Sequence, residues 1–367
     1  MRILRLRKKS GGLLAEAVLL AAFAAAPAFA AAGRPVFPAF SVSTGAPLFS
    51  QAAATGVVVG QGGNCAVPLP DGRTLWLLNN VMTGERKADG RREVWDITDG
   101  AAALAPSTAP LAQAGAFAYV AEENGLPLPL LSGDLREYTQ VRKFWPRAGL
   151  CSGGRCAVFY SIMNNFGAGP YDYFRVGQGV ASSENPAGPY AKARRDGRYS
   201  LWSDIEPAFG SALLEDADGW VYVYGRLMTA PGEYGAALAR VRPDGLTSRA
   251  GYSYYGVNAA SGPWTSDVSE ASVVLENAPE DMSVSYNEFL KSYLAVYLDE
   301  KTSAVQARLA PAPWGPWGPP VRLFACAPED YCYGAREQPA FAADGGKRVF
   351  LTLERKNEPY LYELKFE

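Results

Sequence analysis

Three glutamates stand at similar places in repeated segments of the chain, where they could act together as acids. Glu206 is followed by Pro-Ala-Phe and an apolar run, Glu337 is followed by Gln-Pro-Ala-Phe, and Glu280 stands just before another apolar run. Glycoside hydrolysis needs two carboxyl groups a few ångströms apart, one protonated and one ionised. Burial and a nearby like charge would raise the pKa of one of them. We predict Glu280 as the catalytic acid, with Glu206 or Glu337 as its partner. The structural alternative is that each glutamate binds a neighbouring backbone group or an arginine, such as the one that precedes Glu337.

Five polar or aromatic residues in the same repeats are candidates for binding a substrate. Asn64 and Lys143 open two further repeats, Asn80 and Asn164 end the second apolar run of two repeats, and Tyr286 ends the run that follows Glu280. Amide groups could hydrogen-bond sugar hydroxyls, and we predict that these five residues bind the substrate. The alternative for the asparagines is structural, because asparagine favours turns and strand ends.

The chain contains no histidine. This absence excludes Ser-His-Asp and Cys-His nucleophiles, histidine metal ligands and a histidine general base. The cysteine spacings do not match a zinc site. The glycine-rich segment Gly60–Gly63 does not precede a helix, so it is not a nucleotide-binding fingerprint. We also find no ordered calcium-binding motif, and we predict no cofactor.

The elements that position these residues are predicted to be short strands joined by tight turns. Met282–Tyr286 and Ser292–Leu298 have apolar residues at alternate positions, and Ala304–Leu309 follows as a third strand. A Pro-Trp-Gly-Pro-Trp segment then ends the unit, since proline cannot donate to a β-ladder. The same plan recurs with Asp-Gly turns, which are strong hairpin signals.

About five such units follow one another, and repeated antiparallel sheets of three or four strands indicate a β-propeller. The sequence therefore predicts an all-β, five-bladed propeller over residues 56–367, and we expect the residues entering each first strand to meet at one central site. Residues 31–55 form a linker or closing segment. The last strand, Tyr360–Phe366, could complete a blade begun near the N-terminus. A β-sandwich is the alternative fold.

The N-terminal segment has the pattern of an export signal. A basic stretch precedes the apolar run Ala17–Ala26, and Ala28-Phe29-Ala30 is a cleavage-site pattern. Removal of residues 1–30 takes the formal net charge from −2 to −6, which is unsuited to nucleic-acid binding. No stretch reaches the length of a membrane span. We expect a secreted or periplasmic monomer.

Export to an oxidising compartment would allow the five cysteines to form disulfides. Cys151 and Cys156 flank one short turn, and Cys326 and Cys332 flank another. We predict these two local disulfides, which leaves Cys65 as a free thiol.

Several of these segments together resemble a known family. They are GGNCAVPLPDGRTLWLLNN, EPAFGSALLEDADGWVYVYG, EDMSVSYNEFLKSYLAVYL and APAPWGPWGPPVRLF. The chain resembles a family of secreted bacterial proteins long labelled a domain of unknown function and related to five-bladed-propeller glycosidases. Some members of that family look like endo-D-arabinanases, so the resemblance implies a polysaccharide or oligosaccharide as partner.

The resemblance also implies two catalytic aspartates in the first blade, and the matching positions here are Asn64 and Asn80. An asparagine side chain cannot ionise, so it can be neither a general base nor a carboxylate nucleophile. Three hypotheses follow. The chain is a glycoside hydrolase whose acids lie elsewhere, with Glu280 and Glu206 first in line; it is an inactive relative that binds carbohydrate; or it is a structural or protein-binding propeller of the cell envelope.

Overall fold

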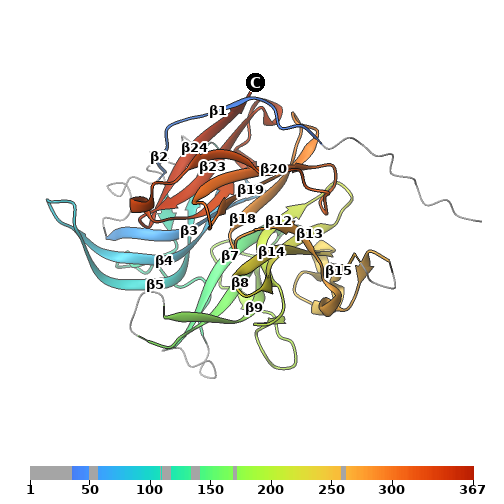
Figure 1. Cartoon of the computed structure of the whole chain (residues 1–367). Coiled ribbons are helices and arrows are strands. Elements are labelled where there is room, and N and C mark those ends of the chain that lie inside the picture. The colour runs from blue at the N-terminus through green and yellow to red at the C-terminus, as the bar shows by residue number, and fades with distance from the viewer. Residues whose placement is uncertain are drawn as a thin grey trace, which may run out of the picture. The chain divides into compact units, whose positions relative to one another are not determined.

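The computed structural model describes residues 35–48, 57–107, 109, 117–133, 141–167, 172–257 and 262–367. The predicted export signal lies outside these residues. The unit that begins at Arg34 consists of five antiparallel sheets arranged in a ring (Figure 1). The prediction of an all-β, five-bladed propeller is confirmed.

Each blade has at least four strands, and the innermost strands of the five blades are β3, β7, β12, β18 and β22. The strands of the first blade are β3 (Val58–Pro68), β4 (Thr74–Arg86), β5 (Arg92–Ala105) and β6 (Ala118–Tyr119). Those of the second are β7 (Arg142–Ser152), β8 (Arg155–Asn165), β9 (Tyr173–Ser183), β10 (Ala191–Lys192) and β11 (Trp202–Ser203). Those of the third are β12 (Ala208–Glu215), β13 (Val221–Ala230), β14 (Glu233–Val241), β15 (Ser253–Tyr255), β16 (Trp264–Thr265) and β17 (Val273–Glu276).

The last two blades follow the same plan, and the fifth includes strands from the N-terminal segment. The strands of the fourth blade are β18 (Met282–Asn287), β19 (Ser292–Asp299), β20 (Ala304–Ala310) and β21 (Val321–Ala325). Those of the fifth are β22 (Cys332–Glu337), β23 (Arg348–Arg355), β24 (Glu358–Phe366), β1 (Phe40–Val42) and β2 (Ala46–Pro47).

Within the described residues, helix is limited to single 3₁₀ turns. They are η2 (Pro243–Gly245), η3 (Arg249–Gly251), η4 (Val268–Glu270), η5 (Pro328–Asp330), η6 (Pro339–Phe341) and η7 (Asp344–Gly346).

The core is divided into five apolar clusters, one between each pair of neighbouring blades. Trp202 of the second blade packs on Phe209 of the third, for example, and Trp76 of the first packs on Phe341 beside the fifth. Blades that are covered on both sides need strands that are apolar on both faces, which explains why β8 is a nearly continuous buried run. Burial between neighbouring blades therefore helps to stabilise the ring.

The ring closes where the two ends of the described chain meet in the fifth blade. β24 pairs with β1, with Phe366 opposite Phe40. The N-terminal segment thus supplies the outermost strand of the blade whose three inner strands are β22, β23 and β24.

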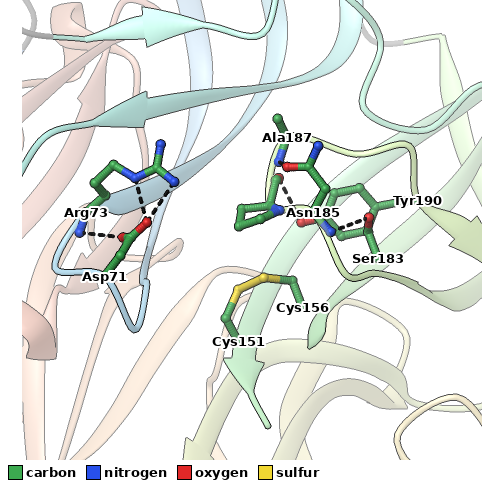
Figure 2. Close-up of a disulfide and its surroundings, with 9 residues drawn as sticks. Asp71, Arg73, Cys151, Cys156, Ser183, Asn185, Ala187 and Tyr190 are labelled. Carbon is green, nitrogen blue, oxygen red and sulfur yellow. Dashed lines mark hydrogen bonds and ion pairs between the residues drawn. A yellow bond between two sulfur atoms is a disulfide. The ribbon is translucent and has the colours of Figure 1, made fainter. Parts of the chain in front are cut away.

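Both predicted disulfides are present, and Cys65 is free. Figure 2 shows the Cys151–Cys156 disulfide at the end of the β7–β8 hairpin, together with the Asp71–Arg73 ion pair of the β3–β4 turn. The same view includes the turn after β9, in which Asn185 accepts a hydrogen bond from the Ala187 N–H at 3.0 Å.

The expectation that all the candidate acids stand before a first strand is wrong for Glu337. Glu206 and Glu280 do precede β12 and β18, but Glu337 is the last residue of β22. The Pro-Ala-Phe that follows it forms the 3₁₀ turn η6 instead of opening a strand. Asn64 lies within β3 and Lys143 is the second residue of β7.

Candidate functional site

The five inner strands, β3, β7, β12, β18 and β22, surround a central channel with two chemically different ends. We call the end at which these strands begin the mouth, and the end at which they finish the base. Because each blade runs up and down, the end of its second strand and the start of its third also lie at the mouth.

The mouth contains a pocket of about 250 Å³ between the third, fourth and fifth blades. Three acids stand in its wall: Glu280 and Asp281, which immediately precede β18, and Glu300, which forms an ion pair with Arg226 at 3.0 Å. Tyr331 and Tyr333 from the start of the fifth blade provide aromatic surface. Arg226 of β13, in the third blade, also lines the pocket. We call this the mouth pocket; its acids, aromatic rings and cation are groups that can hydrogen-bond and stack on a sugar.

Two buried arginines fix Glu280 and Asp281 of the mouth pocket. Arg147 of β7 forms ion pairs with Glu280 at 3.0 Å and with Asp281 at 3.4 Å. Arg336 of β22 forms a second ion pair with Asp281 and donates to the Met282 carbonyl at 3.2 Å. Both arginine side chains are only 6% exposed, so each needs a carboxylate partner to remain buried as a cation.

These contacts set the charge of the pocket. Burial alone would raise the pKa of Asp281, but the charges of Arg336 and Arg147 outweigh burial and lower this pKa below its ordinary value. The Ser161 hydroxyl donates to Glu280 Oε1 at 3.3 Å and accepts from Arg147 Nε at 2.9 Å. Asp281 therefore remains ionised at neutral pH, and both oxygens of Glu280 are engaged.

A further acid lies behind the pocket wall. Glu354 of β23 is completely buried, and burial followed by the negative charge of Asp281 raises its pKa well above the ordinary value. Burial thus favours the protonated form of Glu354. Asn64 lies beside it and partly offsets the rise in pKa, while the Asn64 amide donates to the Gly334 carbonyl at 2.9 Å. Asn64 thus connects the first blade to the fifth.

The base of the channel has a different cavity, of about 380 Å³, lined by all five inner strands. Glu337 lies in its wall and is 3% exposed. Its Oε2 accepts from the Ser285 hydroxyl at 2.6 Å, and its backbone N–H donates to the Ser283 hydroxyl at 2.7 Å. Burial raises the pKa of Glu337 to about 7, and the Ser285 hydrogen bond offsets only part of the rise. Tyr286 and the free Cys65 line the same base cavity.

The three predicted catalytic glutamates are therefore not gathered at one pocket. Glu280 lines the mouth pocket and Glu337 lines the base cavity. The Glu206 side chain is held by Arg249 at 2.5 Å and by the Ser203 N–H at 2.7 Å. Burial alone would raise its pKa, but these partners lower the pKa of Glu206 to about 2. This is the arginine-bound arrangement that we gave as the structural alternative.

The predicted substrate-binding residues are also dispersed. Lys143 forms an ion pair with Asp99 of β5, and Asn164 accepts from Arg142 Nε at 3.2 Å. Asn80 lies half-buried on β4, with a φ of 46° that places its backbone in the left-handed region. Left-handed backbone is tolerated by asparagine better than by most residues, so the local conformation accounts for asparagine at this position.

Sequence reasoning missed most of the residues that line or support the mouth pocket. Asp281 directly follows a residue that was selected, and it could have been found as a second acid before the same strand. Arg147 and Arg336 stand within otherwise largely apolar strands, and an isolated arginine in such a strand signals a buried ion pair. Nothing in the sequence indicates which acid each arginine reaches.

The described residues contain no cluster of three or more His, Cys, Asp or Glu side chains that could hold a metal ion. Nor does any helix in this part of the chain have the length and apolar character to cross a membrane. Of the predicted catalytic glutamates, Glu280 faces the mouth pocket and Glu337 faces the base cavity.

Residues 118–363 match a family model described as a domain of unknown function, DUF4185. The chain belongs to this family. The match includes the three acids of the mouth pocket, but it begins after the positions of Asn64 and Asn80. No curated protein matches the sequence.

Several solved structures have the same fold as this DUF4185 protein. A candidate hydrolase from Bacteroides ovatus has a TM-score of 0.59 and 16% sequence identity over 84% of this chain and 86% of its own. A GH43_1 enzyme from Xanthomonas citri complexed with xylose has a TM-score of 0.50 and 14% identity over 88% and 89% of the two chains. The propeller is therefore structurally similar to glycoside hydrolases, at identities that establish the fold alone.

Proposed function

We propose that this protein is an exported propeller that binds a furanose-containing polysaccharide, such as arabinan, in the mouth pocket. The observation that carries the proposal is the pair Glu280 and Asp281, fixed by two buried arginines next to Tyr331 and Tyr333. Fixed carboxylate oxygens accept hydrogen bonds from sugar hydroxyls without losing side-chain entropy on binding. Aromatic rings beside them offer an apolar surface for the face of a sugar ring.

At the mouth pocket, binding without cleavage is favoured by the pKa shifts of the surrounding acids. A glycosidase needs a carboxyl group that is still protonated at its working pH. Asp281 is held ionised, Glu206 has a pKa of about 2, and Glu354 is buried behind the wall. Asn64 and Asn80 cannot ionise.

The choice of a furanose polymer depends on the resemblance to arabinanase-like relatives. The structural similarity to glycoside hydrolases supports a glycan as the ligand class. Export is proposed from the N-terminal signal pattern, and the two disulfides support an oxidising location outside the cytoplasm. We propose that the mature protein works as a secreted or periplasmic monomer.

The test is titration calorimetry of the purified protein with arabinan and other furanose polymers, alongside an assay for released reducing ends. Wild type should bind at least one polymer and release no reducing ends. Glu280→Gln should weaken binding, since it removes a charged acceptor from the pocket wall. Equal affinity of wild type and Glu280→Gln would contradict a role for this pocket. Gain of cleavage by Asn80→Asp would support descent from an active enzyme.

Hydrolysis at the base cavity is a second candidate function. One observation favours it: Glu337 has a pKa of about 7 and faces a cavity, as a general acid should. Tyr286 at the rim is 41% exposed and could stack on a sugar. Release of reducing ends by wild type, and its loss in Glu337→Gln, would replace binding by hydrolysis as the function.

A further inference from the structure

Large apolar side chains exposed at the surface gather at the mouth of the propeller. They stand before a first strand, at or after the end of a second strand, or near the start of a third, which are the mouth-end positions of a blade. They include Trp95, Phe166, Phe174, Ile205, Met228 and Tyr331. Exposed apolar groups concentrated on one face mark a binding surface.

Trp95 is the most informative of these residues because the backbone departs from a regular strand at this position. It is 61% exposed, close to the start of β5. In the β4–β5 ladder Thr83 pairs with Asp96 and Gly84 pairs with Val94, so Trp95 is the extra residue of a β-bulge. A bulge redirects a side chain out of the regular alternation, and bulges are common next to functional sites.

Gly84 makes this bulge possible. A Cβ atom at Gly84 would lie 1.9 Å from the carbonyl oxygen of Glu93, which no larger residue could tolerate. Lys87 lowers the pKa of Glu93, and hydrogen bonding to the Trp95 side chain contributes a smaller part of the shift. The indole therefore lies close to a charged neighbour on its own strand.

Hydrogen bonds connect this hairpin to the mouth pocket through the turn between β23 and β24. Arg92 donates to the Lys356 carbonyl at 2.8 Å, and Lys356 N–H donates to the Asp330 carbonyl at 3.0 Å. Asp330 directly precedes Tyr331, which lines the mouth pocket and is 51% exposed. The exposed aromatic rings of Trp95 and Tyr331 thus lie at the two ends of this series of contacts.

We propose that the binding surface extends from the mouth pocket over the β23–β24 turn to Trp95, so that the protein binds a linear stretch of polysaccharide and not a single terminal sugar. This inference rests on the proposed function. The chemistry along this series of contacts suits a glycan: aromatic rings at both ends, with Arg92 and Lys356 between them. Glu93 and Asp96, both exposed, flank Trp95 with charge, whereas the centre of a protein interface is depleted of charged residues.

A protein partner is the competing occupant. Residues 92–98 of β5 pair with β4 on one edge, and no strand among the described residues pairs with their other edge. An unpaired edge can add a strand from a second chain. The test must therefore separate glycan binding from association between protein chains.

The experiment compares soluble arabinan with arabinotriose as ligands for wild type and for three variants. Trp95→Ala should weaken binding of the polymer roughly five- to tenfold, the loss expected for one stacked ring, and leave trisaccharide binding unchanged. Trp95→Phe should retain most of the polymer affinity. Phe289→Ala is the matched control, because Phe289 is an aromatic residue 40% exposed beside the β18–β19 turn at the base.

Each outcome decides a different point. If wild type binds the trisaccharide and the polymer but Trp95→Ala binds both normally, the extended surface is wrong and the mouth pocket stands. Equal loss of both ligands in Trp95→Ala would also refute the extension. If wild type binds neither ligand, arabinan binding itself is refuted, and the extension with it. Self-association of wild type that Trp95→Ala abolishes, measured by analytical ultracentrifugation, would assign the hairpin to a protein interface instead.

Discussion

At the mouth of the channel Asp281 lies between two buried guanidinium groups, whereas at the base Glu337 has serine hydroxyl partners and, among the residues that the structure describes, no ion pair with a cation. Both acids lie at contacts between β22 and β18. Arg336 of β22 forms an ion pair with Asp281 at the start of β18, and the next residue, Glu337, accepts a hydrogen bond from Ser285 near the end of β18. Adjacent residues of a strand point in opposite directions. One step along β22 therefore separates the arginine that lowers the pKa of Asp281 from the glutamate whose own pKa is raised to about 7.

This difference shows that burial alone does not determine what an acid can do. Burial raises the pKa of both carboxyl groups, but only at the mouth do nearby cations reverse the shift. An ionised, fixed carboxylate is suited to accepting hydrogen bonds, and a carboxyl group with a pKa of about 7 is suited to donating a proton. The difference between these two pKa shifts distinguishes the two candidate functions, and the following predictions test it.

The largest expected effect is the loss of a cation at the mouth. Arg147→Met removes the ion-pair partner of Glu280 and one of the two partners of Asp281. Breaking a buried ion pair from one side leaves an uncompensated charge, so we expect the free energy of unfolding to fall by about 3–5 kcal/mol. Urea denaturation followed by tryptophan fluorescence measures the change.

Arg73→Met is the control, because its ion pair with Asp71 is exposed (Figure 2) and its loss should leave the unfolding midpoint unchanged. Equal effects of the two substitutions would show that the mouth arginines are not balancing buried charge.

At the base, the expected effect depends on pH. The pKa of Glu337 rises from 4.5 to about 7 on folding, so between these values the folded state binds more protons than the unfolded state. Stability must then decrease as pH rises from about 4.5 to 7, by up to about 3 kcal/mol. Glu337→Gln cannot titrate and should lose this decrease. Denaturation curves at several pH values, compared as the difference between variant and wild type, remove the contribution of other groups such as Glu354. A difference that does not change across this range would mean that Glu337 is ionised in the folded protein.

Glu206 makes a smaller contribution to the pH dependence of stability, and this contribution has the opposite sign. Its pKa is lowered to about 2 on folding, so its contribution to stability is present above about 4.5 and is lost as pH falls through about 2. Glu206→Gln breaks charged hydrogen bonds to Arg249 and Ser203, and we expect a loss of about 2 kcal/mol at neutral pH. Glycan affinity, measured by calorimetry, should remain at the wild-type value. A loss of affinity without a loss of stability would return Glu206 to the list of functional residues.

The sequence was sufficient for the fold because each blade is made of local hairpins. Asp71-Gly72 and the alternating runs around Ser292–Leu298 predict their own strands, and β18, β19 and β20 lie within one residue of the predicted bounds. The disulfides were predictable for the same reason, as Cys151 and Cys156 are five residues apart. Strands and disulfides that depend on residues close together in the sequence were predicted correctly.

The site was less predictable because it is assembled from residues far apart in the chain. Arg147 and Asp281 are 134 residues apart, and strand pattern does not indicate which blades face each other across the channel. The repeated Pro-Ala-Phe was misleading. After Glu206 it opens β12, but after Gln338 it forms η6, where the Gln338 side chain is held by the Asn64 carbonyl and Thr352 at 2.5 and 2.6 Å. Despite the shared Pro-Ala-Phe, Glu206 lies before an inner strand and Glu337 at the end of one.

The smallest expected effect concerns reactivity at the base and leaves stability unchanged. Burial raises the pKa of the Cys65 thiol, and the charge of Arg336 only partly offsets the rise. Because the thiolate is the reactive form, iodoacetamide at pH 7.5 should label Cys65 in the folded protein more slowly than in urea. The other four cysteines are paired, so Cys65→Ser should take up no label in the absence of reductant. Equal rates in the folded and unfolded protein would show that the base cavity is as polar as the mouth, and the contrast between the two ends would then lose its physical basis.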